Sequence, residues 1–232
     1  GGMVIKEAIA RAKVDVNEIG HLVLGNVIHT EPKDMYISRV AGIKGGLPQA
    51  SGALTVNRLC GSGLQAIISA AQTILLGDTD CAIGAGAESM SRAGYLMPNL
   101  RWGQRMGDGG VTDMMVGALT DPFDSVHMGI TAENIAAKWG ISREAQDAFA
   151  VESHKRAINA IEKGYFKDQI LPVEIKSKKG STFFATDEHA RADASAEGMA
   201  KLRAVFQNDG SVTAGNASGI NDGAAAIVMM EK

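Results

Sequence analysis

Cys60 is the residue whose type and surroundings best suit covalent chemistry, and it lies in the run VNRLCGSG. Before it, Ala53, Leu54 and Val56 predict the end of a buried strand. After it, apolar residues at helical spacing predict a helix over about residues 61–76. A cysteine there lies near free backbone N–H groups and the positive end of the helix dipole, and both stabilise a thiolate. The pattern therefore predicts a nucleophilic thiol on a strand-to-helix turn, an arrangement that resembles other acyl-transfer enzymes.

The glycines beside this cysteine favour the same interpretation. Gly61 and Gly63 leave the approach to the sulfur open and let the backbone come close to the group that is attacked. The alternative is a buried structural cysteine, which is the usual fate of a lone cysteine. The predicted helix would bury one apolar face, consisting of Leu64, Ile67, Ile68, Ala71 and Leu75.

The segment up to about residue 89 alternates apolar strands with helices, a pattern typical of a layered α/β sheet. The predicted helices are 4–12, 34–43 and 61–76, and the predicted strands are 22–25, 53–56 and 81–85. In the last of these strands and just after it, Cys81 is expected to be a small buried residue and Glu88 a structural carboxylate. The IGAGAES run around them lacks the third glycine of a dinucleotide-binding fingerprint, so we do not assign one.

From about residue 90 to 218, glycine, methionine and charge rise and the connections lengthen. This part has predicted helices at 131–139 and 144–162, the second capped by Ser142, a strand-like stretch at 170–175 and a basic turn at 176–180. The apolar run 224–230 predicts a strand that returns to the first sheet. We therefore predict a domain formed by residues 1–89 and 219–232, with residues 90–218 inserted into it.

Composition excludes several classes of protein. The 232 residues include 23 basic and 26 acidic ones, a net charge of −3, which argues against a nucleic-acid-binding surface. No apolar stretch approaches the roughly 18 residues that a membrane span needs, and no signal-peptide pattern opens the chain. Two cysteines distant in sequence make no disulfide framework, and a reactive thiol favours a reducing compartment such as the cytoplasm.

Four segments in order carry a family resemblance: VNRLCGSGLQAI, AIGAGAESMS, HMGITAEN and VTAGNASGINDGAAA. Over essentially the whole chain they resemble the thiolase family, nearest to acetyl-CoA acetyltransferases and β-ketothiolases. The resemblance implies an α/β fold: a layered thiolase-like N-terminal domain, with a mixed sheet and helices, plus an inserted loop domain over 90–218. Thiolases transfer an acyl group between a cysteine and coenzyme A, by cleaving 3-oxoacyl-CoA or condensing two acyl-CoA molecules. By this resemblance Cys60 is the acyl-accepting nucleophile.

The resemblance also implies a site for CoA and acyl-CoA in the inserted domain. Its residues would be Leu119, His127, Met128, Arg191, Leu202, Phe206, Ala214, Gly215 and Ser218. His127 and Met128 would line the pantetheine and acyl pocket, Arg191 would meet the phosphates, and Ser218 would donate to the pantetheine. We expect no tightly bound cofactor and no metal, because CoA and acyl-CoA are substrates.

Each of these residues has a plainer interpretation when it is considered alone. His127 could cap a loop, Arg191 could be a solvated surface residue, and Leu202 and Phe206 could be ordinary core. The small residues 212–219 could form a tight turn between two domains.

Two catalytic segments that thiolases carry in a second half are absent from this sequence: a GHP-type segment with the activating histidine and a CxGGG-type segment with the acid/base cysteine. A NEAF-type segment, which supplies an oxyanion-hole asparagine, is absent too. The chain thus resembles the N-terminal half of a thiolase, and taken alone we expect it to have little thiolase activity. The alternatives are a truncated, non-catalytic module that binds CoA or assists assembly, and a relative of the ketoacyl synthases. The synthases lack the inserted loop domain, which argues against the second.

We also expect a homo-oligomer, a dimer or a tetramer. The loop 101–110 resembles the one that contributes to tetramer assembly in bacterial thiolases, although it could equally be a plain surface loop.

Overall fold

The computed structural model describes residues 1–231, and they form two compact units. The first unit consists of Gly1–Ala118 together with the segment from Ile220 onward, and the second consists of Leu119–Gly219. In this division residues 90–118 lie in the first unit, whereas the sequence places them in the inserted domain. The assignment of 90–218 as a loop domain stays a prediction.

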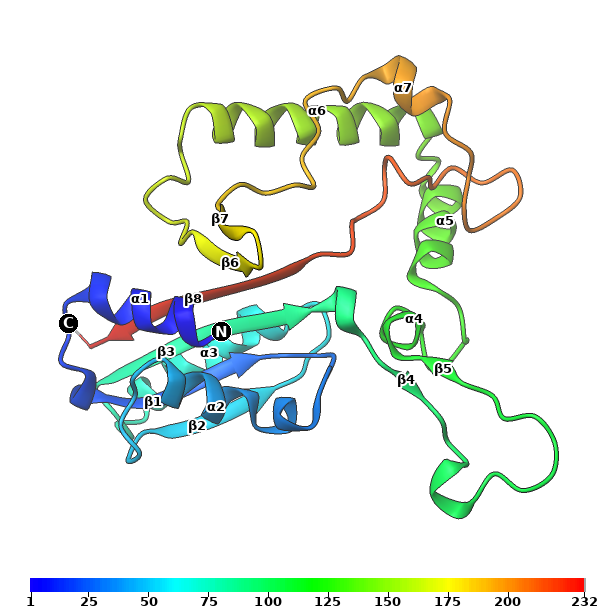
Figure 1. Cartoon of the computed structure of the whole chain (residues 1–232). Coiled ribbons are helices and arrows are strands. Elements are labelled where there is room, and N and C mark those ends of the chain that lie inside the picture. Colours follow the sequence, from blue (N-terminus) through cyan, green and yellow to red (C-terminus); the bar gives the residue numbers. More distant parts are fainter. Residues whose placement is uncertain (232) are drawn as a thin grey trace. The chain divides into compact units, whose positions relative to one another are not determined.

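The first unit is built around a four-stranded sheet with the order β2-β1-β3-β8 (Figure 1). Its strands are β1 (Ile19–Gly25), β2 (Gly52–Val56), β3 (Cys81–Ser89) and β8 (Asp222–Met230). β1 pairs in parallel with both β2 and β3, and β8 pairs antiparallel with β3. The predicted mixed sheet is therefore confirmed, as is the return of the apolar run 224–230 to it.

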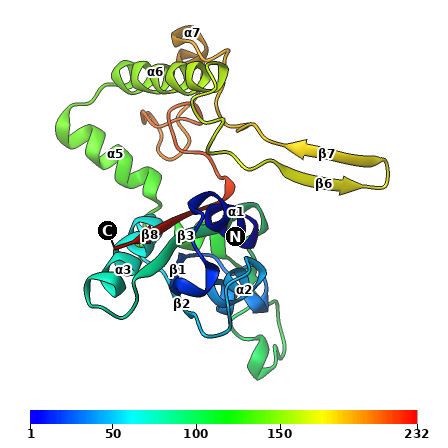
Figure 2. The same ribbon diagram turned by 90° about the vertical axis from the view of Figure 1, so that its left-hand side faces the viewer.

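Helices lie on both faces of this sheet, as Figure 2 shows. They are α1 (Gly2–Ala12) and α2 (Ile37–Lys44) on one face and α3 (Ser62–Leu75) on the other. Leu22 and Ile83 are fully buried on the α1–α2 side, and Val23 and Ala82 on the α3 side. This period of two along β1 and β3 places apolar residues on both faces, as expected for strands covered on both sides.

Smaller elements complete the first unit. They are the 3₁₀ turns η1 (Val16–Glu18), η2 (Pro32–Tyr36), η3 (Met90–Arg92) and η4 (Leu100–Trp102), the two-residue strands β4 (Tyr95–Leu96) and β5 (Thr112–Asp113), and α4 (Met114–Ala118). The helix predicted over 34–43 is in fact divided into η2 and α2. Pro32 and a capping box between Glu31 and Asp34 open the 3₁₀ turn, and the α-helix begins only at Ile37.

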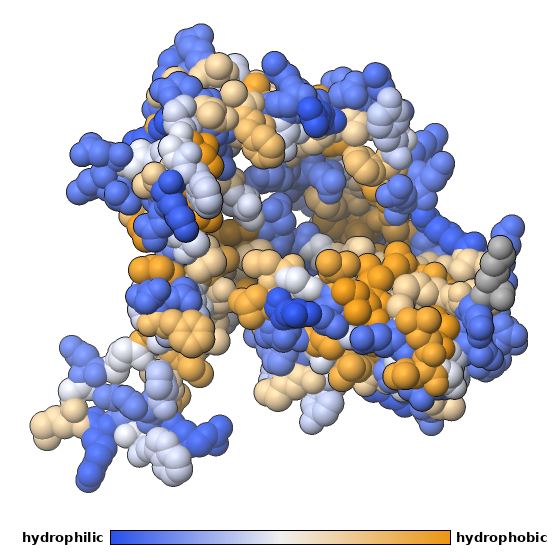
Figure 3. All heavy atoms as spheres, turned by 180° about the vertical axis from the view of Figure 1, so that it is seen from behind, coloured by the Kyte–Doolittle hydropathy of each residue, from blue (hydrophilic) through white to orange (hydrophobic). Residues whose placement is uncertain are grey.

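The face that α3 buries differs from the predicted one. Its buried residues are Ser62, Ala66 and Ala70, while the predicted core residues Leu64 and Leu75 are 65% and 83% exposed. Figure 3 shows the apolar side chains gathered on the face of the first unit that carries α3. The prediction assumed that the larger apolar side chains of the helix face the sheet. The helix instead lies so close to the sheet that its buried side chains are small ones.

Gly84 of β3 shows how close this approach is. A Cβ added at Gly84 would lie 2.9 Å from the Cα of Ile67, nearer than real Cβ atoms come to their neighbours. Such spacing requires glycine at position 84, because any side chain there would meet the backbone of the helix.

The second unit has three helices and one hairpin in its described residues. These are α5 (Met128–Trp139), α6 (Arg143–Glu162), α7 (Ala196–Ala200) and the antiparallel pair β6 (Val173–Ser177) and β7 (Gly180–Phe184). Ser142 caps α6 as predicted, since its Oγ accepts a hydrogen bond from the Ala145 N–H at 3.2 Å. The strand predicted at 170–175 begins later, directly after Pro172, which has no N–H to donate to a ladder.

None of the helices in residues 1–231 combines the length and apolarity that crossing a membrane would require.

Candidate functional site

Cys60 lies on the surface of the first unit, in a turn between β2 and α3. The N–H groups of Gly61 and Ser62 donate to the carbonyl oxygens of Arg58 and Leu59, both at 3.0 Å, and these bonds close the turn. Because Cys60 is exposed, the interpretation of a buried structural cysteine is wrong for this residue. The thiol is placed where a second molecule can reach it.

Leu59 has a backbone conformation that leucine rarely adopts. Its φ is 48°, in the left-handed region, and such a residue persists only where its surroundings hold it. The Asn57 Oδ1 accepts from the Leu59 N–H at 3.0 Å, and the Ser62 Oγ donates to the Leu59 carbonyl at 2.6 Å. The Ser62 Oγ also accepts from the Arg58 N–H at 2.8 Å. The strained turn that presents Cys60 is therefore held by two polar side chains beside it.

We did not identify Asn57 or Ser62 as functional residues from the sequence. The signal was available: asparagine commonly bonds to the backbone two residues further on, and serine to backbone groups at a helix start. Ser62 is 4% exposed, and its burial under the turn could not be read from the local pattern.

Glycines of the sheet lie beneath the same turn. A Cβ added at Gly86 would be 3.9 Å from the Cα of Gly63, and Gly25 at the end of β1 meets the backbone of Ser62 and Gly63. The start of α3 thus rests directly on the carboxyl ends of β1 and β3. The position of Cys60 follows from the sheet as well as from its own turn.

Glu88 is a structural carboxylate, as predicted. It accepts hydrogen bonds from the Asn26 Nδ2 at 3.0 Å, the Val27 N–H at 2.9 Å and the Ile28 N–H at 3.0 Å. These bonds fix the segment that follows β1 against the end of β3. Cys81 is buried, also as predicted.

The predicted CoA-binding residues all lie in the second unit: Leu119, His127, Met128, Arg191, Leu202, Phe206, Ala214, Gly215 and Ser218. The structure brings several of them together in pairs. The Met128 N–H donates to the Leu119 carbonyl at 2.8 Å. A Cβ added at Gly215 would be 2.5 Å from the Leu202 Cδ1, so the loop carrying Ala214 and Ser218 is pressed against the end of α7.

His127 combines a structural contact with a place in the candidate site. Its Nδ1 accepts from the Gly129 N–H at 3.0 Å, so it caps α5, as the plainer interpretation expects. Its ring also stacks on Phe206, with ring centroids 4.8 Å apart and planes 20° apart. Since Nδ1 accepts, a neutral ring carries its hydrogen on Nε2, which is a donor. A role of His127 in binding stays a prediction.

Arg191 is engaged by a neighbour. Its Nε and Nη2 donate to the two carboxylate oxygens of Asp193 at 3.0 and 2.7 Å, while its own N–H donates to the His154 Nδ1 at 3.2 Å. The hydrogen bonds and charge of Arg191 hold the pKa of Asp193 below its usual value. Exposed pairs of this kind are weak, so a phosphate could replace the carboxylate.

Two buried carboxylates that the sequence did not indicate hold the loop 211–216. Glu133 of α5 accepts from the N–H and Oγ of Ser211, both at 2.9 Å, and from the Val212 N–H at 2.7 Å. Asp147 of α6 accepts from the Asn216 Nδ2 at 2.9 Å. Glu133 and Asp147 are each 6% exposed. An acidic residue on the inner face of an amphipathic helix was the one signal that could have found them.

Within residues 1–231, no three or more side chains of His, Cys, Asp or Glu are grouped so that they could hold a metal ion.

An exposed cysteine on a strand-to-helix turn of an α/β protein resembles the arrangement of the nucleophile in acyl-transfer enzymes. Comparison with known proteins identifies the family. The family model for the N-terminal domain of thiolase matches residues 1–232, and the chain belongs to the thiolase family.

Individual relatives agree with this. The beta-ketothiolase BktB of Cupriavidus necator is 64% identical over 233 residues, covering 100% of this chain and 59% of that protein. Human mitochondrial 3-ketoacyl-CoA thiolase, solved in complex with CoA, superposes with a TM-score of 0.94 at 39% identity, covering 100% of this chain and 58% of that one. The acetyl-CoA acetyltransferase of Bacillus anthracis gives 0.93 at 42%, covering 98% and 58%. The chain therefore spans 59% of the length of the curated relative it matches at 64% identity.

Proposed function

We propose that this chain carries the acyl-accepting part of a thiolase site, in which Cys60 takes an acyl group from an acyl-CoA and returns it to CoA. The observation that carries the proposal is the exposed Cys60 in a turn held by Asn57 and Ser62. In the first step the Cys60 thiolate attacks the thioester carbonyl. The new S–C bond forms as the bond to the CoA sulfur breaks, and the departing CoA thiolate takes up a proton.

The second unit would supply the CoA site. The stacked rings of His127 and Phe206 and the loop pressed against Leu202 offer flat and narrow surfaces suited to a thin, extended ligand. A relative that is 39% identical across the whole of this chain was solved in complex with CoA, which supports the same assignment.

We expect the chain assayed alone to turn over slowly. The sequence has no GHP-type histidine, CxGGG-type cysteine or NEAF-type asparagine, which the family resemblance assigns to deprotonation, carbanion formation and the oxyanion hole. Loss of one oxyanion donor alone commonly lowers a rate by about 10²–10³-fold. Transfer of a single acetyl group to Cys60 requires less of this machinery than carbon–carbon cleavage does.

The intact mass of the protein tests the proposal. After incubation with acetyl-CoA, we expect the wild-type chain to gain the mass of one acetyl group and Cys60→Ala to gain none. Peptide mapping should place the group on Cys60, with unmodified Cys81 as the internal control. Acetylation of Cys60→Ala to the same extent would contradict the role of Cys60.

One observation keeps a second function open. The predicted CoA residues all lie in the second unit and Cys60 lies in the first, so we expect CoA to bind without the thiol. A non-catalytic CoA-binding or assembly module would bind CoA equally well as wild type and as Cys60→Ala and would never become acetylated. We further expect a homo-oligomer, a dimer or a tetramer, in a reducing compartment such as the cytoplasm, which a reactive thiol favours.

A further inference from the structure

The loop 211–218 has few side chains that can pack, because most of its residues are small. Val212 and Thr213 are the buried ones. Hydrogen bonds also hold the loop, and Asn216 makes three of them. Its Oδ1 accepts from the Thr213 N–H at 2.8 Å, and its Nδ2 donates to the Ser211 carbonyl at 3.0 Å and to Asp147 at 2.9 Å. One carboxamide thus closes the loop and ties it to α6.

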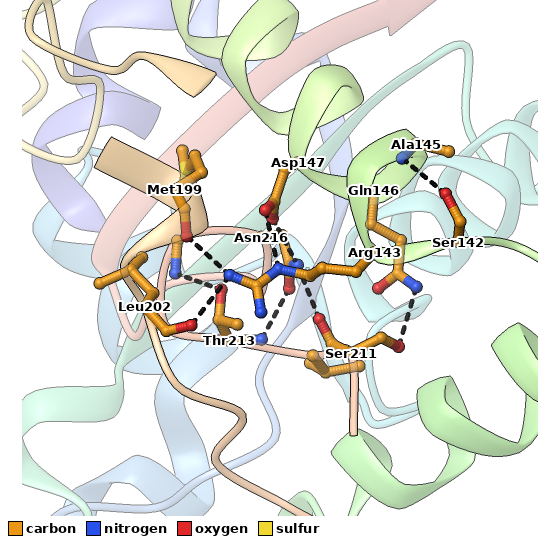
Figure 4. Close-up of polar contacts among 12 residues, drawn as sticks. Ser142, Arg143, Ala145, Gln146, Asp147, Met199, Leu202, Ser211, Thr213 and Asn216 are labelled. Atoms are coloured by element: carbon orange, nitrogen blue, oxygen red, sulfur yellow. Dashed lines mark hydrogen bonds and ion pairs between the residues drawn. The ribbon is translucent and has the colours of Figure 1, made fainter. Parts of the chain in front are cut away.

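Asp147 extends this contact, through Arg143, to the end of α7. Its second oxygen accepts from the Arg143 Nε at 2.7 Å. The Arg143 Nη2 donates to the carbonyl oxygens of Met199 at 2.6 Å and Leu202 at 2.9 Å, as Figure 4 shows. The same network therefore holds the loop that contains Gly215 and the α7 end that Gly215 contacts.

We propose that Asn216 is a positioning residue for CoA, because its hydrogen bonds to Asp147, Ser211 and Thr213 hold the loop 211–218 in the shape that binds the pantetheine arm. This inference rests on the proposed CoA site of the second unit. Asn216 acts through the loop: the backbone groups of Ala214 and Gly215 meet the ligand. Small changes in the loop would then alter affinity for CoA without altering the chemistry of Cys60.

The buried carboxylate of Asp147 needs a hydrogen-bond donor from position 216. A buried carboxylate that already receives Arg143 on one oxygen needs a donor on the other, and the Asn216 Nδ2 supplies it. An aspartate at 216 has nearly the same shape, but its ionised form would place two carboxylates at hydrogen-bond distance. Its protonated form can donate to Asp147 again. The charged groups facing Asn216 are Asp147 and Arg143 of α6 and, through Ser211, Glu133 of α5.

This difference makes Asn216→Asp a test that a merely structural contact would not pass. CoA affinity is measured by calorimetry at pH 7.5 and pH 5.0 for wild type, Asn216→Asp and the matched control Asn208→Asp, whose side chain is exposed. Each affinity is divided by the wild-type value at the same pH, so that titration of the CoA phosphates cancels. We expect Asn216→Asp to bind CoA about tenfold more weakly than wild type at pH 7.5 and to approach the wild-type affinity at pH 5.0. The affinity of Asn208→Asp should stay near the wild-type value at both pH values.

Asp147→Asn provides a second variant should Asn216→Asp not fold. It keeps an oxygen for Asn216 but removes the charge, so we expect weaker CoA binding with no recovery at low pH. Wild-type affinity in Asn216→Asp, or equal weakening at both pH values, would overturn the inference and leave the proposed function intact. If Asn216→Asp does not fold, wild-type CoA affinity in Asp147→Asn would overturn the inference. If the wild-type chain itself does not bind CoA, the proposed function and this inference both fail.

Discussion

Gly25, the last residue of β1, lies directly beneath Ser62, the first residue of α3. A Cβ added at Gly25 would be 2.7 Å from the carbonyl carbon of Ser62 and 2.8 Å from its oxygen. Ser62 in turn bonds to the carbonyl of Leu59, the residue before Cys60. The end of β1 is therefore linked through Ser62 to the turn that presents the Cys60 thiol.

Gly25→Ala should destabilise the chain and disturb the Cys60 turn. The added methyl group would meet backbone atoms, which cannot rotate away, and overpacking of this kind costs about 1–3 kcal/mol. Gly63→Ala is the matched control, because a Cβ there meets no atom within 4 Å and alanine favours a helix. Urea unfolding should give a lower free energy of unfolding for Gly25→Ala only. Equal stability of the two variants would refute the contact.

The two cysteines should differ sharply in reactivity. Burial, followed by the negative charge of Glu18, raises the pKa of the Cys81 thiol, whereas Cys60 is exposed. Under native conditions we expect iodoacetamide to label Cys60 and not Cys81, and urea to expose Cys81. In Cys60→Ala, a native sample should take no label and an unfolded one a single label. Native labelling of Cys81 at the rate of Cys60 would contradict its burial.

Glu133 should make the second unit sensitive to acid. Burial disfavours its charged form, but hydrogen bonds from Ser211 and Val212 outweigh burial and lower the pKa of this carboxyl below its ordinary value of 4.5. Its contribution to stability is therefore complete above about pH 4.5 and is lost as the pH falls through the lowered pKa of the folded state.

Glu133→Gln tests this contribution. At pH 7 we expect it to cost about 1–3 kcal/mol, because the new amide presents a donor to the Ser211 N–H. The difference from wild type in urea unfolding should shrink as the pH is lowered below 4.5. Glu152→Gln, which removes an exposed pairing with Arg156, should change little at any pH. A cost that stays constant down to pH 3 would rule out this account.

Gly129→Ala should separate the stacked rings of His127 and Phe206. A Cβ at Gly129 would overlap the Phe206 ring, whereas one at Gly117 of α4 meets no atom within 4 Å. We expect Gly129→Ala to cost about 1–3 kcal/mol in urea unfolding and to weaken CoA binding, and Gly117→Ala to do neither. The His127 ring resonances in NMR spectra should shift on loss of the stack. Unshifted resonances would show that the rings do not depend on this glycine.

Local patterns predicted much of the first unit. Helical spacing located α3, and the plain apolar run 224–230 was correctly assigned to a strand of the first sheet. The prediction of the buried face of α3 was wrong. The closeness of Gly84 to Ile67 depends on how the helix packs on the sheet and cannot be read from the helix sequence.

The polar network of the second unit was beyond local reasoning for a different reason. Asp147 and Asn216 are 69 residues apart in the sequence, and Glu133 and Ser211 are 78 apart. Periodicity describes which face of a helix is apolar, but it does not identify the partner of an acidic residue on that face. The cysteine motif was found because the residues that present Cys60 lie within eight consecutive positions.

The left-handed backbone at Leu59 also limits how this position can vary. Its side chain is 48% exposed in this chain, so packing does not require leucine here. The backbone conformation restricts the residue type more than packing does, since glycine and asparagine adopt a φ of 48° readily and valine or isoleucine do not. Substitutions at residue 59 should therefore differ in effect. Glycine should keep the turn that presents the thiol, while a β-branched residue of similar size and polarity should disrupt it.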